Sequence, residues 1–271
     1  MTRRVAFGLV LSSLWIPGAI AQDAHTSFYP TEKEVALGRS LAAQIEAKTG
    51  LLDDPVVVEF VEGITDQLAL AAGAEKFLTV GVLDGPEAQT HPLPGGFLLV
   101  RSGLVARAET LAEFAAVLAH DIGHIAARHG TRNASEPLGL RSGASVPMIF
   151  LGGSTGACSR LVAGASVPVA WRKLAAQHEE EADLLALTYM DKAGYDPNGL
   201  ADAFDHLAAD GMPEAVRVTA TVRDKAGEYS AGGRTYIATS SEFIEMRARL
   251  AQALPRERVE RSRSLLRTPG R

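Results

Sequence analysis

The sequence predicts a mainly helical α+β fold with a small β-sheet. Helical periodicity with capping residues covers most of the chain, beginning with expected helices over residues 31–50 and 54–73. The period shortens and β-forming residues dominate only at 77–83 and 97–101, which we expect to be short strands. Two prolines and two glycines at 92–96 predict a turn between these strands. Helices therefore supply most of the expected fold.

The C-terminal half continues the helical pattern. A helix is expected over residues 171–192, and the Asp-Pro pair at 196–197 has the N-cap and first-turn proline of another. A last helix is predicted over 241–254. Residues 216–222 alternate in a way that favours a strand, with 234–239 as its partner. The sequence thus predicts a second pair of strands late in the chain.

Composition indicates a folded protein. The chain has 271 residues, 46% of them hydrophobic and 22% charged, which is enough for one domain of ordinary-to-large size with its own core. The formal net charge is −5, and no long basic block precedes the C-terminal tail, so nothing suggests nucleic-acid binding. The single cysteine, Cys158, excludes an internal disulfide framework.

The N-terminus has the pattern of a secretory signal peptide over residues 1–21. Arg3 and Arg4 precede an apolar stretch, and the small residues of Ala19-Ile20-Ala21 suit cleavage between Ala21 and Gln22. We therefore expect an exported protein, periplasmic in a Gram-negative cell. An uncleaved membrane anchor is the alternative reading of the same segment.

Three segments follow from this organisation. The expected order is the signal peptide, a metal-site domain over residues 22–255 and a basic C-terminal tail over 256–271. Within the domain, residues 131–170 are hard to interpret, because a Gly-rich apolar run from 147 to 170 is interrupted by Arg160. We expect a buried or mobile flap over a site there, with insertion into a membrane as the alternative.

The best-marked helix carries two histidines four residues apart. Thr110 is its expected N-cap, with Glu113 at the reciprocal capping position, and Gly130 is the expected stop. His120 and His124 lie one turn apart on one helical face, so both imidazoles can reach a single metal ion. The apolar stripe of this helix consists of Leu111, Phe114, Leu118, Ile122 and Ile125.

Asp121 and a downstream acidic run complete the candidate site. Zinc hydrolases carry His-Glu-x-x-His, and Asp121 stands where that motif has glutamate. Catalytic zinc usually takes three protein ligands, so one more must come from elsewhere in the chain. The run at 179–183 is the obvious source, because Glu179 and Asp183 share a helical face.

These motifs together resemble a family of zinc endopeptidases. Their order and spacing are similar to those of peptidase family M48, the gluzincin family that includes the CAAX prenyl proteases, the HtpX-type heat-shock proteases and periplasmic assembly proteases. The resemblance implies a gluzincin-like metallopeptidase domain and covers roughly residues 30–210. The segments that carry it are 32–70, 93–97, 103–104, 117–130, 179–183 and 193–197.

The resemblance implies a role for each site residue. Zn²⁺ would be bound by His120, His124 and Glu179, and Asp183 would orient a ligand histidine. Asp121 would be the general base that takes a proton from water. Proteins or peptides would be the substrates, and the edge strand of the family would correspond to Phe97, Leu98, Leu99 and Val100, where an extended peptide could add.

Two departures from the family leave the activity open. Asp121 is one methylene shorter than glutamate, so its carboxylate sits back by about 1.5 Å. Some family members carry a His-Pro-x-x-x-x-Arg motif, whose His-Pro is missing here. We expect its arginine, Arg247, to be a surface residue, with a charge that faces the site as the alternative. We expect an exported endopeptidase of reduced activity, acting in envelope protein quality control by analogy with the family. The alternatives are a pseudoprotease that serves as a binding or chaperone module and, more weakly, a metal-free structural protein.

The other histidines read as ordinary residues. His129 is expected at the helix end, where its charge suits the dipole, and His178 is expected to be exposed. His91 lies beside the expected turn and could face the substrate cleft, although we expect it to be an ordinary residue. Nothing in the sequence indicates a function for His25 or His206.

Overall fold

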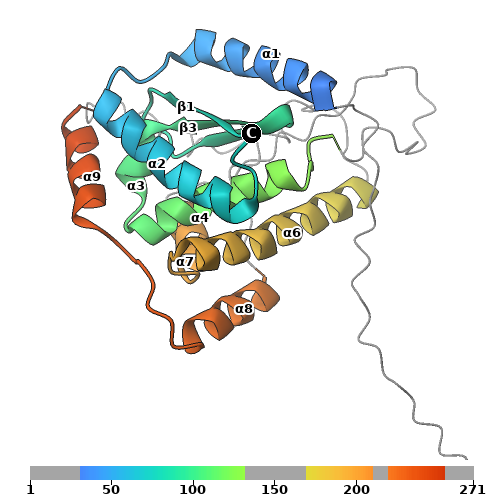
Figure 1. Ribbon diagram of the computed structural model, residues 1–271, viewed down its shortest axis with the longest axis vertical. Helices are drawn as coiled ribbons and strands as arrows, with labels where there is room; N and C mark the ends of the chain where they lie inside the picture. The colour runs from blue at the N-terminus through green and yellow to red at the C-terminus, as the bar shows by residue number, and fades with distance from the viewer. Residues whose placement is uncertain (1–30, 132–168, 210–218, 254–271) are drawn as a thin grey trace, which may run out of the picture.

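The protein is built in three layers around a small sheet (Figure 1). The computed structural model describes residues 31–131, 169–209 and 219–253. Helix α1 (Thr31–Thr49) covers one face of the sheet, and a group of helices that includes α4 (Leu111–Ala126) and α6 (Val169–Ala193) lies on the other side. The prediction of a mainly helical fold with a small sheet is confirmed.

The sheet has three strands, and the strand predicted to bind a peptide lies in its middle. The order is β1 (Thr79–Leu83), β3 (Phe97–Arg101) and β2 (Thr90–Leu93); β3 pairs parallel with β1 and antiparallel with β2. The prediction that Phe97, Leu98, Leu99 and Val100 form an edge strand is therefore wrong, because neighbouring strands already use both sides of the β3 backbone. No further chain can pair with β3.

The second strand was missed because its proline suggested a turn. Pro92 lies in β2 opposite Leu98. The amide of Arg101 donates to the carbonyl of Gln89, so 89/101, 91/99 and 93/97 are the hydrogen-bonded pairs of β2 and β3. Position 92 lies in a non-hydrogen-bonded pair, where an N–H would not point toward β3 and proline is therefore tolerated. The predicted turn is confined to a 3₁₀ segment, η1 (Pro94–Gly96), where Gly95 has φ 73°.

Alternating side chains of β3 divide the apolar interior into two parts. Leu98 and Val100 join the main core with the helices, whereas Phe97 and Leu99 pack toward α1. His91 pairs with Leu99 and so shares the α1 face of the sheet. The alternative in which His91 faces the cleft beside the histidine helix is therefore wrong.

Helix α4 is the centre of the main core. Every residue from Leu111 to His124 is buried. The rings of Phe60, Phe114 and Phe243 pack against one another, with the centroids of each pair 6.2 Å apart. The surrounding helices are α2 (Pro55–Ala72), α3 (Ser102–Arg107), α6, α7 (Gly199–Ala209), α8 (Ala220–Ala231) and α9 (Ser241–Ala253).

The N-termini of α2 and α4 are formed by their predicted capping residues. The hydroxyl of Thr110 accepts from the amide of Glu113 at 3.2 Å, and the Asp54 carboxylate accepts from the amide of Val57. The Glu113 carboxylate bonds to the amide of Glu109 instead of the amide of Thr110. The amide of Ala112 donates to the carbonyl of Ala238 at 2.9 Å, so a distant segment completes the N-terminus of α4.

The predicted late strand pair is wrong. The Thr219 hydroxyl accepts from the amide of Val222 and caps α8, so this part of the alternating run is helical and packs through Val222 and Ala226. Within the described residues, segment 234–239 contributes one isolated bridge, between Ile237 and Tyr195.

Several predictions fall outside the described residues. These concern the signal peptide at 1–21, nearly all of the flap region 131–170, and the tail at 256–271. Among the helices that are described, none is both long and apolar enough to cross a membrane.

Gly38 should be essential for docking α1 on the sheet. A Cβ at this position would lie 1.8 Å from the carbonyl oxygen of Pro94, so we expect Gly38→Ala to destabilise the fold by about 1–3 kcal/mol through overpacking. Chemical denaturation measures this loss. Gly63→Ala on the exposed side of α2 is the matched control, because no atom lies within 4 Å of its added Cβ, and it should stabilise by roughly 0.5–1 kcal/mol. Equal effects at the two glycines would contradict this account of the contact.

Candidate metal centre

Two helices approach closely where their polar side chains meet. Gly123 lies between the two histidines of α4, and a Cβ there would lie 2.9 Å from the carbonyl oxygen of Ala182 on α6. Glycine is needed at this position because any larger side chain would push the helices apart. The contact brings the face of α4 that carries His120 and His124 against the face of α6 that carries Glu179 and Asp183.

Three donor atoms converge between these helices. The Nε2 atoms of His120 and His124 are 3.0 Å apart, and each lies 3.3–3.5 Å from Oε2 of Glu179. Ligands of a tetrahedral zinc ion at bond lengths of 2.0–2.2 Å would be separated by about 3.4 Å. The three residues thus match the spacing and chemistry of a zinc ligand set, and they form a candidate metal site.

Asp183 holds the outer nitrogen of His120. Its Oδ1 lies 2.8 Å from Nδ1 of His120, and both side chains are almost fully buried. Burial alone would lower the pKa of His120, but hydrogen bonds to Asp183 and Glu179 outweigh it and raise that pKa well above its ordinary value. In the neutral imidazole, which is the form that binds metal, Nδ1–H donates to Asp183 and the lone pair of Nε2 faces the other candidate ligands.

The other two ligands have lowered pKa values. Burial lowers the pKa of His124 and favours its neutral form, which is the form that binds metal. Burial alone would raise the pKa of Glu179, but the hydrogen bonds to His120 and His124 hold it well below its usual range. The site therefore presents an ionised carboxylate to two imidazoles.

Asp121 is buried next to this cluster, with its carboxylate near the hydroxyl of Thr90. Neither of its carboxylate oxygens, nor the hydroxyl of Thr90 on β2, is bonded to another of the described residues. Burial raises the pKa of Asp121 to about 7, although the charge of His120 and the nearby Thr90 hydroxyl limit the rise. A buried carboxylate with free acceptor positions has room to accept a hydrogen bond from a water or substrate.

Helix α4 ends four residues before Gly130, the predicted stop. The amide of His129 donates to the carbonyl of His124 and the amide of Arg128 to that of Ile125, which is the bonding pattern of a Schellman motif. Arg128 holds the left-handed position with φ 58°, a place usually filled by glycine. The prediction that Gly130 ends the helix was wrong, because Arg128 takes the left-handed position at which glycine was expected.

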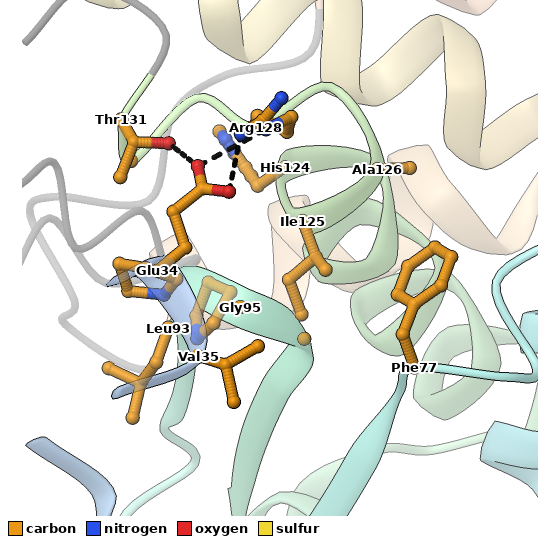
Figure 2. Close-up of a pocket in the computed structure, with 14 residues that line it drawn as sticks. Glu34, Val35, Phe77, Leu93, Gly95, His124, Ile125, Ala126, Arg128 and Thr131 are labelled. Carbon is orange, nitrogen blue, oxygen red and sulfur yellow. Dashed lines mark hydrogen bonds and ion pairs between the residues drawn. The ribbon is translucent and has the colours of Figure 1, made fainter. Parts of the chain in front are cut away.

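Glu34 of α1 holds this turn from the opposite side. Its buried carboxylate accepts from Nε of Arg128 at 3.1 Å, from a terminal guanidinium nitrogen of the same residue, and from the hydroxyl of Thr131 (Figure 2). A bidentate ion pair to a buried carboxylate is among the stronger polar contacts in proteins. It offsets the conformational cost of the left-handed Arg128.

The turn places His129 against His124. Nδ1 of His129 lies 2.9 Å from Nδ1 of His124, and Nε2 lies 3.1 Å from a carboxylate oxygen of Glu181 on α6. His178, which we expected to be exposed, is buried and stacks on the His129 ring with centroids 4.2 Å apart. The prediction for His178 was wrong because it considered only which face of α6 carries the ligand. It did not anticipate that His129, which follows the end of α4, would cover His178.

A cavity of about 240 Å³ opens beside His124 (Figure 2). Most of its wall is apolar, and its polar rim is formed by Glu34, Arg128 and Thr131. The apolar lining consists of Val35, Phe77, Pro92, Leu93, Pro94, Ile125 and Ala126. The chain thus has a hollow next to the candidate site that could take an apolar group.

The remaining candidates lie away from this centre. His206, which carried no signal in the sequence, contacts Glu113 at 3.1 Å and forms a second acidic cluster with Glu109 at the other end of α4. Arg247 is half-buried over the ring of Phe243 and donates to the carbonyl of Glu109, so it does not face the candidate site. His91 has its pKa lowered to about 4 by burial and by Arg101.

A fold with a buried His-x-x-x-His helix and a carboxylate on an adjacent helix defines a class of metallopeptidase-like proteins. The family model described as "Peptidase family M48" matches residues 58–261. The chain belongs to peptidase family M48, and the resemblance inferred from its motifs is confirmed.

Curated relatives of the chain are bacterial proteases. A putative beta-barrel assembly-enhancing protease of Vibrio cholerae is 26% identical over 184 residues, covering 65% of this chain and 38% of that protein. The beta-barrel assembly-enhancing protease of Yersinia pestis is 23% identical over 226 residues, covering 73% and 46%. That of Escherichia coli K12 is 22% identical over 190 residues, covering 65% and 37%. The chain spans less than half of the length of these relatives.

The strain at Arg128 can be measured by comparing two substitutions. Arg128→Gly and Arg128→Ala both lose the contacts with Glu34, but only alanine keeps a Cβ at φ 58°. We expect the glycine variant to be more stable than the alanine variant by about 0.5–1 kcal/mol in chemical denaturation, after allowing for the greater freedom of glycine in the unfolded chain.

Ala127 supplies the control, because it has φ −77° in the right-handed region. Ala127→Gly should therefore destabilise by roughly 0.5–1 kcal/mol. If glycine were the less stable residue at position 128 as well, the turn would not carry the strain described.

Proposed function

We propose that the protein is a zinc-dependent endopeptidase that hydrolyses peptide bonds in proteins. The observation that carries this proposal is the convergence of His120, His124 and Glu179, with their donor atoms 3.0–3.5 Å apart, beside the buried carboxylate of Asp121. Membership of peptidase family M48 supports the same reaction class.

The residues divide the work between holding the metal and moving a proton. When bound to the three ligands, zinc would supply a Lewis acid that polarises the peptide carbonyl and lowers the pKa of water. Asp121 then takes the proton of the attacking water on a carboxylate oxygen and passes it to the leaving nitrogen. Asp183 fixes the ring of His120 in the orientation that directs Nε2 inward.

The substrate main chain is proposed to lie along β2. Strand β3 is central, so β2 is an edge strand of the described sheet. It is also in contact with α4, which carries the two candidate ligand histidines. Thr90 and Pro92 lie in the pairs that exchange no hydrogen bonds with β3, so their backbone groups point away from it. The N–H and C=O of Thr90 and the C=O of Pro92 could therefore bond to a peptide. An apolar substrate side chain would fit the cavity beside His124.

We propose that the protein is exported to the periplasm, where it acts on envelope proteins. The support consists of the signal-peptide pattern at residues 1–21 and the similarity to beta-barrel assembly-enhancing proteases. Protein substrates are its proposed partners, and contact with a membrane surface is compatible with this location.

A second candidate function is supported by the shorter carboxylate at Asp121. A chain that keeps the fold and the ligands but positions its general base too far from the water would act as a binding or chaperone module. This pseudoprotease would bind zinc and unfolded protein without cleaving it, so hydrolysis of a protein substrate separates the two functions.

Zinc binding tests the ligand set directly. Elemental analysis of the purified mature chain should find about one zinc ion per molecule, and His124→Ala should lose it because two protein ligands rarely hold a catalytic zinc. His206→Ala, which alters the second histidine–glutamate cluster, is the control and should keep the metal. Absence of zinc from the wild-type chain after incubation with zinc would end the peptidase proposal.

Substitutions of Asp121 test its role in catalysis. Asp121→Asn should keep zinc but lower kcat/KM for a denatured protein substrate by about 10²–10⁴-fold, since the amide cannot accept the proton. Asp121→Glu should raise kcat, because the longer side chain brings the carboxylate closer to the metal. A fully active asparagine variant would show that position 121 is not the general base, and an unchanged glutamate variant would show that its length is not limiting.

A further inference from the structure

We propose that His129 and Glu181 form a hydrogen-bonded relay that positions the ligand His124 for metal binding. His129 lies beyond the end of α4, outside the ligand motif, and Glu181 follows the ligand Glu179 by two residues on α6. The contacts run from Nδ1 of His124 to Nδ1 of His129 at 2.9 Å and from Nε2 of His129 to Glu181 at 3.1 Å. This inference rests on the proposed zinc site.

The chemistry of the partners fixes the direction of each hydrogen bond. An ionised carboxylate only accepts, so the contact with Glu181 places a proton on Nε2 of His129. The Nδ1 atom of a neutral His129 then carries a lone pair and accepts from Nδ1–H of His124. The lone pair of His124 is thereby left on Nε2, the atom that faces Glu179 and His120.

The two ligand histidines are thus oriented by the same helix in two different ways. His120 donates directly to Asp183, at 2.8 Å. His124 lies one turn further along α4 and reaches Glu181 only through the imidazole of His129. A ligand histidine held by a carboxylate is oriented and made a better electron donor, and loss of such an outer partner typically costs 10–100-fold in metal affinity.

The rest of the turn keeps His129 in place. The left-handed Arg128 folds the chain back, so that the amide of His129 bonds to the carbonyl of His124 while the two rings meet at 76° with centroids 4.9 Å apart. On its far side, His129 stacks on His178. His129 is buried, so its position is set by its surroundings on several sides.

The test measures zinc affinity by competition with a chromophoric chelator, without reference to activity. His129→Leu should weaken zinc binding by about 10–100-fold, because Nδ1 of His124 loses its acceptor. Glu181→Leu should weaken it by about tenfold, whereas Glu181→Gln should stay near the wild-type value, because the amide oxygen still accepts from Nε2–H of His129.

Glu180 provides the matched control for charge. It has the same side chain on the same helix, and no ion pair to a histidine is recorded for it among the described residues. Glu180→Leu should therefore leave zinc affinity unchanged. The stability of each metal-free variant is measured as well. If His129 had a purely structural role, His129→Leu would lower stability, and Glu181→Leu, at a half-exposed residue, would keep its zinc affinity.

Each outcome decides the proposal. A loss of affinity in the two relay variants, with Glu181→Gln near normal and Glu180→Leu unaffected, supports it. Unchanged affinity in His129→Leu, or an equal loss in Glu180→Leu and Glu181→Leu, overturns the relay while leaving the zinc site intact. A wild-type chain that binds no zinc overturns both the relay and the proposed function.

Discussion

The close approach of α4 and α6 at Gly123 is the constraint on which the rest of the site depends. A side chain at this position would meet the backbone of Ala182 and separate the helices. The donor atoms would then no longer lie within bonding distance of one ion, because metal–ligand distances tolerate only about 0.2 Å. Gly123 therefore acts on the site without supplying a donor atom, by setting the distance between two helices that are far apart in sequence.

Burial of so many polar groups is the second constraint. His120, His124, His129, His178 and Asp183 are all less than 6% exposed, and buried polar groups cost free energy unless they are hydrogen-bonded. Carboxylates of α6 satisfy most of them, so the helix that carries the candidate ligand Glu179 also carries the carboxylates that contact His120 and His129. The carboxylate oxygens of Asp121 lie beside these groups without a hydrogen bond to the described residues, so they are free to accept one from a bound molecule.

Much of this structure follows from local signals in the sequence. Thr110 and Asp54 cap the helices as expected, Gly73 ends α2 in a left-handed conformation, and the ligand spacing on α4 and α6 follows from helical geometry. These features depend on residues a few positions apart, so pattern alone predicts them.

The parts that sequence missed depend on partners far away in the chain. Pro92 forms part of β2 because the ladder needs no N–H at that position, and only the pairing register reveals this. Arg128 replaces the expected glycine because Glu34, ninety-four residues earlier, binds its side chain. His129 and His178 meet only after that turn has formed, so spacing within either helix could not have placed them together.

The dependence of α4 on residues near the end of the domain has a consequence for synthesis. Phe243 completes the ring cluster around Phe114, and the carbonyl of Ala238 satisfies the amide of Ala112. A ribosome makes both residues after both candidate metal-binding motifs have been made. While the chain is still growing, α4 lacks one of its packing partners and one hydrogen bond at its N-terminus. The candidate metal centre therefore cannot reach its final form before these late residues have been translated.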